Sequence, residues 1–119
     1  MANDKHLNIL KQGIPEWNQW RKNNSEELPD FSDAELQDAD LQGVNFENAN
    51  LKGANLFDVN LMGANLRNSD LQETILYEAK LDNVDLRGAS LLKADGITNA
   101  LIETAIIDEN TKLPEYLNL

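Results

Sequence analysis

Large apolar residues recur at every fifth position between residues 31 and 91. The series has thirteen members and no gap: Phe31, Leu36, Leu41, Phe46, Leu51, Leu56, Leu61, Leu66, Leu71, Leu76, Leu81, Leu86 and Leu91. A second series precedes each of these from Leu36 onward by two positions and consists of small or β-branched residues: Ala34, Ala39, Val44, Ala49, Ala54, Val59, Ala64, Ser69, Thr74, Ala79, Val84 and Ala89. Two sets of positions therefore keep the same five-residue period.

This period fits neither a helix nor a flat strand. Five residues advance an α-helix by about 500°, so the leucines would spread around every face of the helix. In a flat strand an odd spacing would place successive leucines on opposite faces, and half would contact water. The leucines stay on one side only if the chain turns once per repeat and winds into a coil around them. The pattern predicts a β-solenoid with both series inside.

The repeated segments "ADLQG", "ANLKG", "ANLFD", "ANLRN" and "VDLRG" resemble the A(D/N)LXX motif of the pentapeptide-repeat family. The resemblance covers 66 of the 119 residues, from Asp30 to Asp95. Departures are mild: Ser69 and Thr74 replace the usual alanine, and Ile75, Lys80 and Ser90 replace the usual Asp or Asn. The resemblance implies an all-β fold, a right-handed quadrilateral β-helix with twenty residues per coil.

The end coils of a solenoid expose apolar surface unless something covers them. We therefore predict an N-terminal helical cap over residues 1–28, the β-helix over 29–95, and a degenerate final coil with a C-terminal cap over 96–119. A helical spacing of apolar residues predicts one helix near residues 4–12 and a second that begins at Pro15, a favoured first helical position. The predicted cap residues are Leu7, Leu10, Ile14, Trp17 and Trp20.

Two alternatives concern these flanks. The tryptophans either pack in the cap or form a ligand site. The segment "HLNILKQGIPEWNQWR" that contains them resembles the opening of some cyanobacterial family members. After Leu91 the period weakens, because Gly96 breaks it while Leu101 and Ile106 satisfy it. The last apolar residues, which are Leu113, Tyr116, Leu117 and Leu119, cover the coil end or meet a second copy. We expect a monomer or a weak end-to-end dimer.

With twenty residues per coil, each outward residue lies about 4.8 Å from the one twenty positions later. Asp38, Asp58 and Glu78 then form an acidic column, and Phe57 lies beneath Tyr77 with Ile75 on the same side. Stacked aromatic residues can stabilise adjacent coils. Exposed aromatic residues with a charged rim are also typical of protein interfaces. These six residues are the candidate protein-binding patch, with inter-coil stacking as the alternative.

The charge excludes several kinds of partner and chemistry. Twenty-one acidic and ten basic residues give a net charge of −11, which disfavours nucleic acids and anionic membranes because phosphate binding requires clustered Lys and Arg. With no cysteine and only His6, the sequence offers no nucleophile–base pair, so we predict no catalytic residue, cofactor or metal site. The N-terminus resembles neither a secretory signal nor a membrane span, so cytoplasmic localisation is expected.

A non-enzymatic protein-interaction or scaffold module is the predicted function, and two alternatives remain open. One is a purely structural β-helix without a dedicated partner. The other is mimicry of DNA toward gyrase or a related topoisomerase, which the family resemblance suggests. Residues 30–95 carry a net charge of −8, or one charge per roughly 2 Å of a rod about 16 Å long, against about 1.7 Å in duplex DNA. The short rod and the absence of an inserted loop disfavour mimicry.

Overall fold

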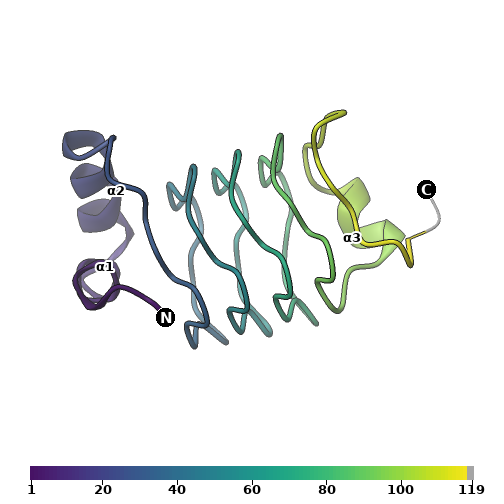
Figure 1. Cartoon of the computed structure of the whole chain (residues 1–119), viewed down its shortest axis with the longest axis horizontal. Helices are drawn as coiled ribbons and strands as arrows, with labels where there is room; N and C mark the ends of the chain where they lie inside the picture. The colour runs from purple at the N-terminus through teal and green to yellow at the C-terminus, as the bar shows by residue number, and fades with distance from the viewer. Residues whose placement is uncertain (118–119) are drawn as a thin grey trace.

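The computed structural model describes residues 1–117, so Leu119 lies outside the described residues. The helices are α1 (Asp4–Lys11), α2 (Ile14–Asn23) and α3 (Asn99–Glu103). Between α2 and α3 the chain winds in successive coils along the long axis of the molecule, with the helices at the two ends (Figure 1). The molecule measures 39 × 24 × 21 Å. No helix among residues 1–117 is long and apolar enough to cross a membrane.

Parallel β-bridges join residues twenty positions apart, and four bridge columns run along the coils. Their members are residues 30, 50, 70 and 90 on side A, residues 35, 55, 75 and 95 on side B, residues 40, 60 and 80 on side C, and residues 45, 65 and 85 on side D. Within residues 1–117 these pairs are isolated bridges and no extended strand forms. The predicted twenty-residue coil is thus present, whereas the all-β description holds only as columns of single bridges.

Each repeat ends in a tight turn that requires an unusual backbone conformation. The Ala64 N–H donates to the Leu61 carbonyl at 2.9 Å, which closes the turn. The residue before each such alanine or its equivalent has a positive φ, as at Asp58 (56°) and Gly63 (70°), and this holds at every fifth position from 33 to 93. Gly, Asn and Asp tolerate this region best, so the turn explains why the repeats favour these residues there.

The Asp or Asn of the motif caps the same turn. In nine repeats its side-chain oxygen accepts a hydrogen bond from the backbone N–H two residues later. Asn55 accepts from the Phe57 N–H and Asn60 from the Met62 N–H, both at 3.1 Å. Asx turns of this kind make Asp and Asn favourable in loops. Ile75 and Lys80 have no such oxygen, so their presence needs another explanation.

The thirteen large apolar residues point into the coil, and all are buried except Leu36, which is half-buried. The alanines Ala34, Ala49, Ala54 and Ala64 are buried as well, whereas Ala39 is half-buried. Leu36 and Ala39 border a cavity of about 310 Å³ that Leu10 and Ile14 also line. The N-terminal helices thus leave one part of the first coil incompletely covered.

Helices α1 and α2 close the N-terminal coil end. The Asn3 side chain caps α1 by accepting from the His6 N–H, and α2 begins at Ile14, one residue before the predicted start. Trp17 is fully buried, and its indole N–H donates to the Asn45 carbonyl at 2.8 Å. Of the other predicted cap residues Leu10 is buried, while Leu7, Ile14 and Trp20 are half-buried.

The predicted inward positions of Leu101 and Ile106 are wrong, although bridges to residues 106 and 112 continue the coil in a degenerate form. Helix α3 begins at Asn99, with the Thr98 side chain accepting from the Leu101 N–H at 3.0 Å. Ile97 and Ile102 are buried instead of the predicted positions: Leu101 is half-buried and Ile106 is exposed. The helix adds residues to the coil, so the last bridges join residues 85 to 106 and 90 to 112, no longer twenty positions apart.

Candidate interaction surface

Side B carries the three apolar residues of the candidate patch. The Asp38 N–H donates to the Phe57 carbonyl and the Asp58 N–H to the Tyr77 carbonyl, both at 2.9 Å, so these residues lie in register on successive coils. Ile75 bridges the neighbouring coils through its pairs with Asn55 and Asp95. Their exposed fractions are 42% for Phe57, 54% for Tyr77 and 38% for Ile75. The structure therefore brings the three apolar side chains together at the surface.

Five acidic residues surround them on the same side. Asp38, Asp58 and Glu78 occupy the turn positions, and all three are exposed. Glu35 and Asp95, which the sequence reasoning missed, are exposed in the bridge column of side B. The twenty-residue register could have revealed both acids, because positions 35, 55, 75 and 95 lie on the same side of the coil. We name the eight residues the acidic–aromatic face: Glu35, Asp38, Phe57, Asp58, Ile75, Tyr77, Glu78 and Asp95.

The charge of this face differs from that of the other sides. Residues 35–39, 55–59, 75–79 and 95 include no Lys or Arg. Lys52 and Lys93 lie on side A, Lys80 on side C, and Arg67 and Arg87 on side D, as the register shows. The face is therefore a local concentration of negative charge, which attracts cations and basic side chains.

Local backbone conformation accounts for part of the acidic column. Asp38 and Asp58 have φ values of 63° and 56°, a region that Asp tolerates. Glu78 adopts a φ of 63° without that advantage. Turn chemistry therefore explains two acids of the column and leaves Glu78 unexplained. Among residues 1–117 no three His, Cys, Asp or Glu side chains are grouped so that they could hold a metal ion.

The outward rings do not stack on one another. All seven close ring pairs among residues 1–117 lie at the N-terminal end and involve His6, Trp17, Trp20, Phe31 and Phe46. Phe57 and Tyr77 form no close ring pair in this part of the chain. The interpretation of these rings as inter-coil stacking thus loses its main geometric support, while their exposed surface remains available to a partner.

A cleft of about 350 Å³ lies at the C-terminal edge of the face. It is lined by Tyr77, Asp95, Gly96, Ile97, Thr98 and Tyr116. The Tyr116 hydroxyl donates to the Ala94 carbonyl at 2.5 Å and accepts from the Ile97 N–H at 3.2 Å. Burial of this hydroxyl raises the pKa of Tyr116, and the nearby Asp95 carboxylate acts in the same direction. Tyr116, predicted only as cap or dimer surface, thus extends the apolar part of the face.

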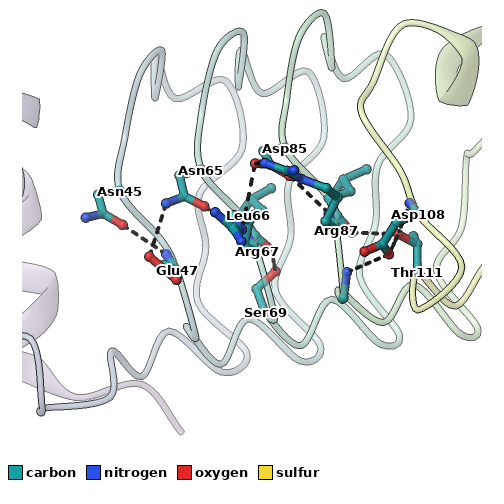
Figure 2. A network of polar contacts seen from close by, with 12 residues as sticks. Asn45, Glu47, Asn65, Leu66, Arg67, Ser69, Asp85, Arg87, Asp108 and Thr111 are labelled. Atoms are coloured by element: carbon teal, nitrogen blue, oxygen red, sulfur yellow. Dashed lines mark hydrogen bonds and ion pairs between the residues drawn. The ribbon is translucent and has the colours of Figure 1, made fainter.

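Side D has charges of both signs that neutralise one another (Figure 2). Arg87 makes two hydrogen bonds to the Asp85 carboxylate, at 2.9 and 2.7 Å, and the Arg67 Nε lies 3.9 Å from the same group. The hydrogen bonds from Arg87 lower the pKa of Asp85, and Asp85 raises the pKa of Arg87. Further along, Asp108 accepts from the Gly88 N–H at 3.2 Å. This side therefore satisfies its own charges.

The N-terminal end holds the only histidine, in a structural setting. His6 is buried, its Nδ1 accepts from the Asp30 N–H at 3.0 Å, and its Nε2 lies 2.6 Å from the Glu27 carboxylate. The buried Arg21 donates to the carbonyls of Glu27 and Glu47. Both ring nitrogens of His6 and both terminal guanidinium nitrogens of Arg21 are thereby used to hold the cap, and sequence reasoning had not predicted either contact.

Family comparisons agree with the repeat geometry. A model of the pentapeptide repeats, in eight copies, matches residues 30–68 and 54–91, together just over half of the chain. This result confirms the resemblance drawn from the A(D/N)LXX segments. No curated protein sequence matches the chain significantly.

Solved structures of pentapeptide-repeat proteins are similar over part of the chain. Rfr23 from the cyanobacterium Cyanothece 51142 is 30% identical, covering 71% of this chain and 60% of that one with a TM-score of 0.46. HetL from Nostoc sp. strain PCC 7120, involved in heterocyst differentiation regulation, is 30% identical, covering 71% and 44% with a TM-score of 0.43. QnrB1, a plasmid-mediated fluoroquinolone resistance protein, is 16% identical, covering 73% and 61% with a TM-score of 0.37. The chain thus spans less than two thirds of each of these relatives.

Proposed function

The chain belongs to the pentapeptide-repeat family, and we propose that it is a non-enzymatic protein-interaction module whose acidic–aromatic face binds a partner protein. The observation that carries this proposal is the grouping of Phe57, Ile75 and Tyr77 at the surface, without ring stacking, on the side that has no basic residue. Exposed apolar groups with a charged rim are the usual composition of a protein interface.

Comparison with Met62 supports this reading of the exposed apolar residues. Met62 is 37% exposed on side C, close to the value for Ile75, but it is the one large exposed apolar residue on that side among the coil residues 30–95. Isolated apolar side chains are normal at protein surfaces, whereas groups of them are typical of binding sites. Exposure of a single residue therefore does not distinguish side B from side C. The difference is that within residues 30–95 side B groups three exposed apolar residues, whereas side C has one.

Two finer statements accompany the proposal. We propose that the coils form a right-handed quadrilateral β-helix, a form that the family resemblance implies and that the four bridge columns support. We also propose that the protein acts in the cytoplasm. A small-angle scattering profile of the isolated protein would test the elongated shape, and fluorescence microscopy of a tagged chain would test the location.

Capture from an extract of the source organism tests the interaction directly. Immobilised wild-type protein is compared with Phe57→Ser/Tyr77→Ser, and Met62→Ser serves as the control for loss of an exposed apolar residue on another side. We expect a partner that wild type and Met62→Ser retain and the double variant loses, with circular dichroism unchanged in all three. Equal retention by all three proteins would move the site away from this face. No specific retention by any of them would favour the purely structural alternative.

Mimicry of DNA toward gyrase has less support from the charge distribution. Acids occur on all four sides, but net negative charge is largest on side B, while Arg67 and Arg87 balance the acids of side D and Arg87 pairs with Asp85 there. Duplex DNA presents negative charge on all sides. We expect no inhibition of gyrase supercoiling at micromolar protein, and inhibition in that assay would favour the mimicry alternative over the interaction module.

A further inference from the structure

The cleft at the C-terminal edge of the acidic–aromatic face has a chemical character of its own. Two of its lining side chains are the tyrosines Tyr77 and Tyr116, which come from a coil and from the C-terminal segment, and its one charged lining residue is Asp95. The tyrosines are 54% and 55% exposed. The cleft thus combines a carboxylate with two accessible aromatic rings.

Both rings are held in place by contacts that leave them accessible. The Tyr116 hydroxyl is fixed by its bonds to the Ala94 carbonyl and the Ile97 N–H. Tyr77 packs so closely on Gly96 that a Cβ there would lie 2.8 Å from the Tyr77 Cγ and 2.5 Å from its backbone nitrogen. Because the rings are positioned before a ligand arrives, binding would cost little side-chain entropy.

Asp95 has no cation of its own. The ion pairs among residues 1–117 involve other acids, and none includes Asp95. A cleft on side A offers a contrast, because its lining residue Lys52 pairs with Glu73 at 3.5 Å. The carboxylate of Asp95 is exposed and available, whereas the charges of the side A cleft are partly satisfied from within.

We propose that this cleft receives an arginine side chain of the partner protein. The guanidinium pairs with the Asp95 carboxylate and lies against the rings of Tyr77 and Tyr116. This inference rests on the proposed function, since it names the chemistry of the partner at one end of the same face. A guanidinium suits the cleft better than an ammonium, because its planar fork bonds a carboxylate through two donors and stacks on aromatic rings. The surrounding acids, Glu78 and Asp58, favour further basic residues beside that arginine.

Titration of the ¹⁵N-labelled full chain with short peptides tests this assignment. The probes are two blocked peptides of alternating glycine and a basic residue, one with three arginines and one with three lysines. We expect the amide signals of Gly96, Ile97 and Thr98 to shift on addition of the arginine peptide, with an affinity at least about three-fold above that of the lysine peptide. Equal affinity for the two peptides would overturn the arginine assignment.

Variants separate the cleft from general attraction between opposite charges. Asp95→Asn should weaken binding of the arginine peptide by about five-fold or more, and Tyr77→Leu should remove the preference for arginine over lysine. Asp82→Asn makes the same charge change on side C and should weaken binding less than two-fold. If Asp95→Asn and Asp82→Asn weaken binding equally, long-range charge explains the binding and the cleft is not the site.

The peptide titration and the capture experiment can fail independently. A partner that binds wild type and Asp95→Asn equally, but is lost by Phe57→Ser/Tyr77→Ser, would uphold the face and refute the arginine cleft. A specific response of the cleft to the arginine peptide, together with no loss of partner in the double variant, would uphold the cleft as a guanidinium site but refute both the proposed function of the face and the assignment of that guanidinium to the captured partner.

Discussion

The two ends of the solenoid use aromatic residues in opposite ways. At the N-terminal end, α1 and α2 cover the first coil (Figure 1). Trp17 there contacts the rings of Trp20, Phe31 and Phe46. At the C-terminal end the helix α3 has five residues, and Tyr116 keeps 55% of its surface exposed. The first end buries the rings of Trp17, Phe31 and Phe46, and the second presents a ring beside an unpaired carboxylate.

Polar contacts show the same difference. Trp17 is fully buried, so its indole N–H has to find the Asn45 carbonyl inside the protein. Tyr116 bonds the backbone through its hydroxyl while its ring faces outward. Hydrogen bonds at the N-terminal end stabilise the closure of the core, whereas at the C-terminal end they orient an exposed ring. The N-terminal end therefore contributes more to stability than the C-terminal end, and the C-terminal end is suited to binding.

A substitution in the core of the coils should have the largest effect on stability, since both ends pack on the coils. Leu61 is buried and Met62, the next residue, is exposed. Leu61→Asp places a charge in the core and should cost more than about 4 kcal/mol, enough to unfold the protein. Met62→Asp should change stability by less than about 0.5 kcal/mol. Thermal melting followed by circular dichroism compares them, and equal effects would contradict the inward and outward assignment.

Removal of a ring at each end tests the contrast itself. Trp17→Ala should lower the free energy of unfolding by about 3–5 kcal/mol, because it opens a cavity and leaves the Asn45 carbonyl without its donor. Tyr116→Ala should cost roughly 1–2 kcal/mol, since it loses two hydrogen bonds and little buried surface. Urea unfolding measures both values. A larger loss at Tyr116 than at Trp17 would reverse the roles assigned to the two ends.

Two glycines sharpen the description of the C-terminal end. Gly96 has a φ of 91°, and an added Cβ would lie 2.5 Å from the Tyr77 backbone nitrogen, so Gly96→Ala has to move backbone and should cost about 2–3 kcal/mol. Gly63 has a φ of 70° and no atom within 4 Å of the added Cβ. Gly63→Ala should therefore cost only about 1 kcal/mol. Similar losses in urea unfolding would show that Gly96 does not position Tyr77.

Lowering the pH should reduce the stabilising contribution of the N-terminal end, by less than the substitutions above reduce stability. The hydrogen bond from His6, with a further contribution from Lys5, lowers the pKa of Glu27 below its ordinary value of 4.5. The ionised Glu27 therefore stabilises the folded state above pH 4.5, and this contribution is lost as the pH falls through the lowered pKa. Between about pH 6 and pH 3 the melting temperature of wild type should fall further than that of Glu27→Gln. Parallel declines would show that the His6–Glu27 contact contributes little.

The repeating part of the fold was predictable because one physical requirement recurs every five residues. A large residue such as Leu61 fills the interior, and Asn60 and Gly63 serve the turn on either side of it. The ends follow no such rule. Helix α3 moves the buried positions from Leu101 to Ile102, which a periodic extrapolation misses. The pair of His6 with Glu27 joins residues 21 positions apart, and only the folded chain reveals it.

The candidate surface was predictable to a similar degree. The twenty-residue register placed Phe57 and Tyr77 on one side, because it follows from the coil alone. The cleft was not predictable, since Tyr116 reaches it through the irregular segment after α3 and Gly96 through its close approach to Tyr77. Both depend on tertiary contacts outside the repeats.

Site-specific photo-crosslinking in cells tests the central claim most directly. A photoreactive benzoylphenylalanine replaces Phe57 in one variant, Tyr77 in a second and Met62 in a matched control. The interaction account predicts that the variants at positions 57 and 77 form a cross-link to the same protein on irradiation and that the variant at position 62 does not. Equal cross-linking from position 62, or none from either position on the acidic–aromatic face, would contradict it.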